Sequence, residues 1–125
     1  ITVRVASAQR SVAWYQDVLG MRLLCIEPVP KYNFDLYFLA FTLDAPPMPD
    51  DLRHISNREW LYQRPYTTLE IQHRTGGSQS FADVDLEPGM GGFESISVCV
   101  GLERYQELSA LMDADGVVRD PDGMK

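Results

Sequence analysis

The chain has 125 residues, of which 45% are hydrophobic and 23% are charged, and its formal net charge is −7. This length and composition predict one soluble folded domain, and the absence of a long apolar run excludes a membrane span. The negative charge opposes binding to nucleic acid, because no lysine or arginine cluster reverses it locally.

The first part of the chain shows the pattern strand, helix, strand, strand, strand. ITVRV alternates like a strand, and Ser7 can cap a helix that ends at Gly20. Three further strands are predicted over residues 21–27, 34–43 and 66–73. Between the last two lies an excursion, residues 44–65, rich in proline and charge, in which we expect a short helix from about Asp51 to Tyr62.

A second, shorter copy of this pattern follows. FESISVCV at 93–100 reads as a strand, and residues 102–116 read as a helix with Leu102, Tyr105, Leu108 and Met112 at helical spacing. The distance from Val5 to Gly20 is 15 residues, and from Val100 to Gly116 it is 16, which indicates an internal duplication. Only VVRDPDGMK follows Gly116, so either this copy is degenerate or residues are absent after it and near Gly116; we favour absence.

The residues that bear on chemistry are few. In TTLEIQHR, Leu69 and Ile71 share one face of the strand, while Glu70 lies on the other, polar face. That polar face is either exposed to solvent or lines a functional site. His73 falls on the Leu69 face and is expected to be packed or satisfied there, and His54 is expected to face solvent.

The two cysteines give no functional motif. Cys25 and Cys99 lie far apart in apolar, strand-like runs, so neither a CxxC metal motif nor a dense disulfide framework is present. Both are predicted to be buried free thiols. No targeting segment is visible, which predicts a cytoplasmic protein.

The segments TVRV, RSVAWYQDVLGMRLL, FDLYFLAF, TLEIQH and RDPDG together resemble glyoxalase I, the lactoylglutathione lyase of the vicinal oxygen chelate superfamily. The resemblance covers almost the whole chain. It implies an α+β fold in which paired βαβββ modules form a curved mixed sheet, here one domain over 1–125 with module one at about 1–75 and an apparently incomplete module two at about 92–125. It also implies a divalent metal, zinc or nickel, and a homodimer.

The implied reaction converts the hemithioacetal of methylglyoxal and glutathione to S-lactoylglutathione. A metal holds the substrate oxygens and stabilises an enediolate while a carboxylate moves a proton. Two alternatives remain open: a dioxygenase or other metal enzyme of this fold that does not use glutathione, and a metal-free binding module for small molecules.

The resemblance assigns metal ligands only in part. Glu70 matches the glutamate ligand of the first module. The first ligand of the family falls just ahead of Ile1, and the second glutamate, which often serves as the catalytic base, falls beyond Lys125, so the catalytic residue is unknown. Ser95 stands where the family has a ligand histidine, and serine is a poor ligand for zinc or nickel. Glu94 could replace it through a one-residue bulge.

The substrate contacts also match only in part. Arg4 matches the arginine that pairs with a glutathione carboxylate, with an exposed strand cation as the alternative. Arg74 stands where the family has an asparagine, and Gly91 where it has an arginine. The substrate is therefore expected to be a small molecule, with the use of a glutathione adduct left open.

Overall fold

The computed structural model describes residues 1–75 and 95–123 of the chain. Within these ranges it contains four β-strands, three α-helices and one short 3-10 helix, an α+β content that confirms the sequence prediction. In chain order the elements are β1 (Thr2–Arg4), α1 (Ala8–Asp17), β2 (Arg22–Val29), η1 (Pro30–Tyr32), β3 (Phe34–Ala40), α2 (Ile55–Leu61), β4 (Leu69–Arg74) and α3 (Leu102–Ser109).

The chain separates into two compact units, Ile1–Asp85 and Leu86–Lys125. The first unit contains the sheet with α1 and α2, and the second contains α3. Of the candidate site residues, Arg4, Glu70 and Arg74 lie in the first unit, whereas positions 94 and 95 belong to the second. None of the described helices is both long and apolar enough to cross a membrane.

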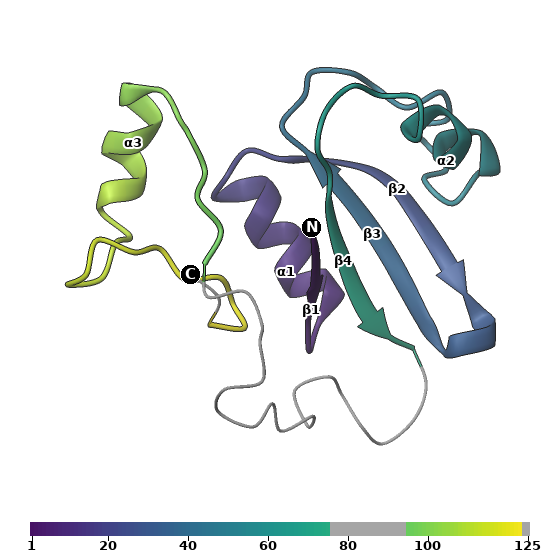
Figure 1. Cartoon of the computed structure of the whole chain (residues 1–125), viewed down its shortest axis with the longest axis horizontal. Helices are drawn as coiled ribbons and strands as arrows, with labels where there is room; N and C mark the ends of the chain where they lie inside the picture. The colour runs from purple at the N-terminus through teal and green to yellow at the C-terminus, as the bar shows by residue number, and fades with distance from the viewer. Residues whose placement is uncertain (76–94, 124–125) are drawn as a thin grey trace. The chain divides into compact units, whose positions relative to one another are not determined.

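A single mixed sheet holds the four strands in the order β1-β4-β3-β2 (Figure 1). β1 runs parallel to β4, whereas β3 is antiparallel to both β4 and β2. The parallel pair is possible because the chain passes through α1, β2 and β3 before it returns beside β1. Along the chain, β1, α1, β2, β3 and β4 follow one another in the order βαβββ.

The helix α1 begins where the sequence indicates and ends at Asp17, three residues before the predicted end at Gly20. The Ser7 side chain accepts a hydrogen bond from the Arg10 backbone N–H, which satisfies one of the free donors of the first turn. At the other end Gly20 has a φ of +74° and donates its N–H to the Gln16 carbonyl. A glycine suits this left-handed position because a Cβ would strain the backbone there.

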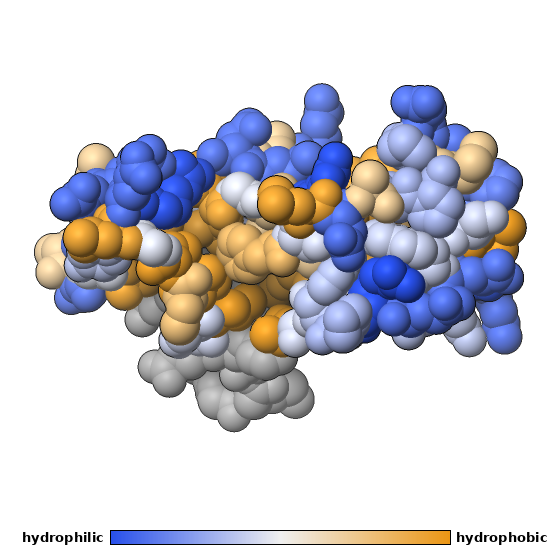
Figure 2. Space-filling view, turned by 90° about the horizontal axis from the view of Figure 1, so that it is seen from above, coloured by the Kyte–Doolittle hydropathy of each residue, from blue (hydrophilic) through white to orange (hydrophobic). Residues whose placement is uncertain are grey.

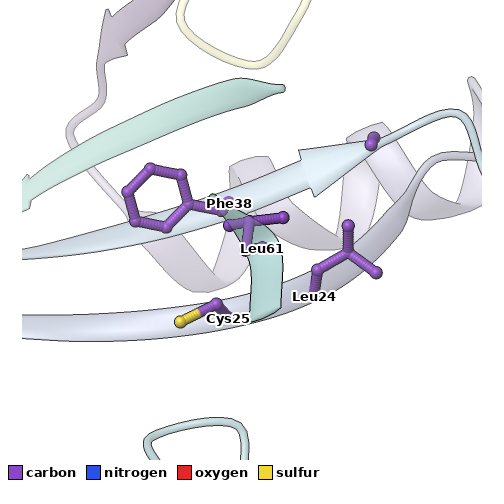
Figure 3. Packing of buried hydrophobic residues seen from close by; sticks show 5 residues of the cluster. Leu24, Cys25, Phe38 and Leu61 are labelled. Carbon is purple, nitrogen blue, oxygen red and sulfur yellow. The ribbon is translucent and has the colours of Figure 1, made fainter. Parts of the chain in front are cut away.

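The two faces of the sheet bury different sets of residues. On one face Val3, Ile71 and Leu39 are nearly fully buried, and α1, which contacts β4 and β2, buries Val12 and Tyr15. The other face carries a second apolar cluster of Leu24, Cys25, Phe38 and Ala40 with Leu61 of α2, with Leu36, Trp60 and Tyr66 packed against it. Figure 3 shows the close packing of this cluster, to which β2, β3 and α2 each contribute. Helices α1 and α2 therefore cover opposite faces of the sheet.

The excursion 44–65 is anchored to the exposed edge of the sheet. The Ile26 N–H of the edge strand β2 donates to the Leu52 carbonyl at 2.9 Å, which gives an edge donor a partner. On the α1 face Arg53 pairs with Asp35 at 2.9 Å. On the α2 face Arg58 pairs with Glu27 at 2.6 Å. The excursion thus straddles β2, and Figure 2 shows a mainly hydrophilic surface on the side where Figure 1 places α2.

A buried asparagine fixes the shape of the excursion. Asn57 of α2 is fully buried, and its Oδ1 accepts a hydrogen bond from the Met48 N–H at 2.8 Å. Its Nδ2 donates to the carbonyls of Met48 and Asp51, both at 2.9 Å. His54 caps the same helix by accepting the Ser56 N–H at Nδ1, so the expectation that His54 is simply a solvent residue was wrong.

In the second unit the helix begins at Leu102 as predicted but ends at Ser109 rather than at Gly116, and the described part of the predicted strand does not form. α3 forms within residues 102–116, yet residues 95–100, the described part of the expected strand 93–100, have no regular secondary structure. A strand needs a partner for its backbone groups, and no described residue of this unit supplies one. Cys99 is therefore exposed rather than buried as expected, and of the predicted helix stripe Leu108 is buried while Leu102 and Tyr105 are exposed.

The turn that follows α3 is organised by one carboxylate. Asp113 Oδ1 accepts the N–H groups of Asp115 and Val117, each at 3.0 Å, and Oδ2 accepts from Arg119. The backbone donor of Val117, followed by that of Asp115 and by Arg119, lowers the Asp113 pKa. Glycine at position 116, with a φ of +74°, completes this turn.

Candidate functional site

The site face is the face of the sheet that α2 covers in part, and its residues form two rows across the strands. The strand register pairs Thr2 with Glu70, Glu70 with Phe38, and Phe38 with Cys25. The second row consists of Arg4, Gln72, Leu36 and Glu27. Side chains that are directly opposite across a sheet point to the same side, so both rows begin with polar groups on β1 and β4 and continue with an apolar residue on β3. The first row ends at Cys25 and the second at the Glu27 carboxylate.

Glu70 lies near the middle of the first row. Its side chain is half-buried, and Oε1 accepts a hydrogen bond from the Thr2 hydroxyl at 3.1 Å. On its other side it neighbours Phe38, which is 5% exposed. The predicted alternation is confirmed, because Leu69 and Ile71 are buried on the opposite face. The Glu70 carboxylate therefore has a hydroxyl on one side and a buried ring on the other. This face of β4 is partly shielded from solvent rather than fully exposed.

The two candidate substrate-binding arginines lie on β1 and β4. Arg4 is exposed, and its Nε donates to Gln72 Oε1 at 3.2 Å. Arg74 shares the parity of Glu70 and Gln72 at the exposed end of β4. The β1 and β4 side of the site face therefore carries two guanidinium groups beside the Glu70 carboxylate.

The apolar part of the site face does not supply a reactive thiol. Burial is the main cause that raises the pKa of Cys25 to about 11, with a smaller contribution from the Glu27 carboxylate, while Arg58 lowers it. The thiol is therefore protonated at neutral pH, and a protonated thiol is a weak nucleophile and a poor metal ligand. Cys25 serves the packing of this face.

The end of α2 places polar groups over the same face. Arg58 donates to Glu27, and this hydrogen bond raises the Arg58 pKa further. Tyr62 follows the helix, and burial together with the Glu27 carboxylate raises its pKa, with a smaller contribution from Glu70. The raised pKa keeps the Tyr62 hydroxyl protonated, and therefore a hydrogen-bond donor, at neutral pH.

The described residues do not form a complete metal centre. No group of three or more His, Cys, Asp or Glu side chains suited to hold a metal ion occurs among residues 1–75 and 95–123. Glu94, the second ligand candidate, lies outside the described residues, and Ser95 is exposed. His73 is half-buried on β4, with the parity of the Leu69 face. Glu70 is a suitable oxygen donor, but one carboxylate falls short of the four ligands usual for zinc.

The sequence pattern missed several groups of this face. Thr2 and Gln72 contact the predicted residues Glu70 and Arg4, and both could have been found from strand parity once β1 and β4 were paired. The pair Glu27–Arg58 joins residues 31 positions apart, and no local pattern signals such a contact.

Comparisons with known proteins agree on one family. No protein-family model matches the chain. The lactoylglutathione lyase of Pseudomonas putida is 31% identical over an alignment of 139 residues, which covers 97% of this chain and 77% of that enzyme. The lactoylglutathione lyase of Haemophilus influenzae is 49% identical over 39 residues, or 31% of this chain and 29% of that enzyme. The solved structure of the trypanothione-dependent glyoxalase I of Leishmania major matches with a TM-score of 0.55 at 23% identity, over 99% of this chain and 78% of that one.

These matches bear on both fold and sequence. The likeness to the Leishmania structure shows the fold. The alignment with the Pseudomonas enzyme is 14 positions longer than the chain (139 against 125), so it contains at least 14 positions at which this chain has no residue. The alignment with the Pseudomonas enzyme covers nearly all of this chain and most of that enzyme at 31% identity. The chain therefore belongs to the lactoylglutathione lyase family, and it has the glyoxalase I fold.

Proposed function

We propose that the protein is a glyoxalase I-like, metal-dependent isomerase that converts the hemithioacetal of methylglyoxal and glutathione to S-lactoylglutathione. Membership of the lactoylglutathione lyase family supports this proposal. The structural observation that carries it is the position of Glu70, a half-buried carboxylate bonded to Thr2 beside the buried ring of Phe38. The same face carries an arginine suited to a substrate carboxylate.

Glu70 is proposed to be one ligand of a divalent metal, zinc or nickel. The Thr2 hydroxyl would orient the carboxylate, as groups that hydrogen-bond to a ligand commonly do. The remaining ligands would come from outside the described residues, with Glu94 the candidate from this chain. The bound metal would stabilise negative charge on the substrate oxygens.

The other residues of the site face would bind and orient the substrate. Arg4, held by Gln72 through its Nε, would offer its remaining N–H donors to a carboxylate of glutathione. Leu36 and Phe38 would cover the reacting end of the adduct and exclude water from it.

The proposal is tested by measuring formation of S-lactoylglutathione by the zinc- or nickel-loaded protein. Glu70→Gln retains the shape of the side chain but removes the charge, and we expect turnover to fall at least about a hundredfold. Glu59→Gln, on the exposed side of α2, is the matched control and should retain full activity. Equal activity of the two variants would remove Glu70 from the mechanism.

Ser95 favours a second candidate function, a metal-free module that binds a small molecule. Serine stands where the family resemblance expects a histidine ligand, and it is exposed in the structure. Such a module would bind its ligand without metal, and Glu70→Gln would reduce its affinity little. Metal content separates the two functions.

A further inference from the structure

A charged pair closes the end of the site face that lies farthest from β1. Glu27 ends the row that begins at Arg4, and its Oε1 accepts from Arg58 Nη1 at 2.6 Å. The side chains are 38% exposed for Arg58 and 22% exposed for Glu27, so solvent or a ligand can reach them. Because three strand spacings separate β1 from β2, the ends of the row lie about 14 Å apart.

The substrate class of the proposed function can extend along this direction. A glutathione adduct carries its acyl part on the sulfur of the central cysteine, so an adduct held at Arg4 by a terminal carboxylate would direct its acyl part across the sheet toward Glu27. Its acyl end would pass over the apolar residues Leu36 and Phe38 and reach the charged pair. The inference thus rests on the proposed function, which supplies the orientation of the ligand.

The pair has unused capacity for hydrogen bonding of both kinds. Arg58 has five N–H donors, of which one is directed at Glu27, and Glu27 has a second carboxylate oxygen. The pair has no net charge, so a further anion would meet the Glu27 carboxylate as well as the guanidinium. A hydroxyl group both donates and accepts hydrogen bonds, so it matches the pair. An alkyl or aryl group would displace water from the pair without replacing the hydrogen bonds that the water made.

A second observation on the same face also indicates a missing polar partner. The Tyr66 hydroxyl is buried and has no hydrogen-bond partner among the described residues. Tyr66 packs against the cluster that includes Cys25 and Phe38. Buried hydroxyls are normally paired, so the apolar cluster of this face leaves one polar group available to a ligand or to water.

We propose that Glu27 and Arg58 form a specificity-determining pair that selects adducts of 2-oxoaldehydes with a hydroxyl group on the acyl part. The pair would bind the hydroxyl between the guanidinium and the carboxylate. Adducts with a methyl or phenyl group at that place would bind and react less well.

The test compares kcat/KM for the glutathione adducts of 3-hydroxy-2-oxopropanal, methylglyoxal and phenylglyoxal, with the metal-loaded full chain. The double variant Glu27→Leu/Arg58→Met removes both charges together, which avoids leaving one buried charge unpaired. The matched control is Asp35→Leu/Arg53→Met, because this pair anchors the same excursion on the opposite face of the sheet. Arg58→Lys keeps the positive charge but changes the arrangement of the N–H donors. It provides a second test of the preference if the double variant does not fold.

We expect the wild type to prefer the hydroxylated adduct, and the preference to fall about tenfold in Glu27→Leu/Arg58→Met and by a smaller factor in Arg58→Lys. The control pair should retain the wild-type preference. A preference that is the same in wild type, the double variant and Arg58→Lys would overturn the inference while leaving the proposed function intact. Absence of turnover of all three adducts by the metal-loaded wild type would overturn both.

Discussion

Replacement of Asn57 by alanine should destabilise the protein by about 3 kcal/mol. The substitution removes three hydrogen bonds, each with a net contribution near 1 kcal/mol, and leaves the Met48 N–H and the carbonyls of Met48 and Asp51 without their partner. The loss reaches the core, because Leu61 of the same helix packs against β2 and β3. A domain of this size is typically stable by about 5 to 15 kcal/mol, so the loss is a large fraction.

Urea denaturation followed by circular dichroism measures this loss. With a slope of about 1.5 kcal/mol per molar urea, the midpoint should fall by about 2 M. Glu59→Ala, at an exposed position of the same helix, is the control and should change the free energy of unfolding by less than about 0.5 kcal/mol. If Asn57→Ala were no less stable than this control, the hydrogen bonds of Asn57 would not hold the excursion.

Three further predictions concern α1, the core thiol and the candidate ligand. Gly20→Ala should lower the free energy of unfolding, measured by thermal denaturation, by about 1 kcal/mol, because Gly20 has a φ of +74°. There is open space for the added Cβ, so the loss would come from the backbone alone, and an unchanged stability would contradict this. The Cys25 pKa is raised from 9.0 to about 11, so its contribution to stability is complete below pH 9 and is lost as the pH rises through 11. Over that range wild type should lose roughly 2 kcal/mol more than Cys25→Ala in urea titrations, and parallel curves would refute the burial argument. Thr2→Val should reduce hemithioacetal turnover about tenfold relative to the control Thr67→Val, through the lost hydrogen bond to Glu70, and equal rates would count against that role.

Local signals in the sequence were sufficient for the start of α1 and for the buried face of β4. The Ser7 cap and Gly20 fix the ends of α1 through backbone hydrogen bonds made within a few residues. The alternation around Glu70 fixes which face of β4 is buried, because successive side chains of a strand point to opposite sides. These features depend on neighbours in the chain, and a single sequence displays them.

Features that depend on distant partners were not predictable. Residues 95–100 have strand-like composition, but a strand forms only where another strand pairs with it. The ion pair of Glu27 with Arg58 joins β2 to a helix 31 residues later. The bulge at Leu24, between the pairs formed by Leu23 and Cys25, likewise appears only in the register with β3.

The central claim is that Glu70 is a metal ligand in a glyoxalase I-like enzyme. The most direct test is elemental analysis of the purified protein, with metal counted per chain in wild type, Glu70→Gln and the control Glu59→Gln. We predict about one zinc or nickel per chain in wild type and the control, and a marked loss in Glu70→Gln. Equal metal content in all three proteins, or no metal in any of them after supplementation with zinc and nickel, would contradict the claim.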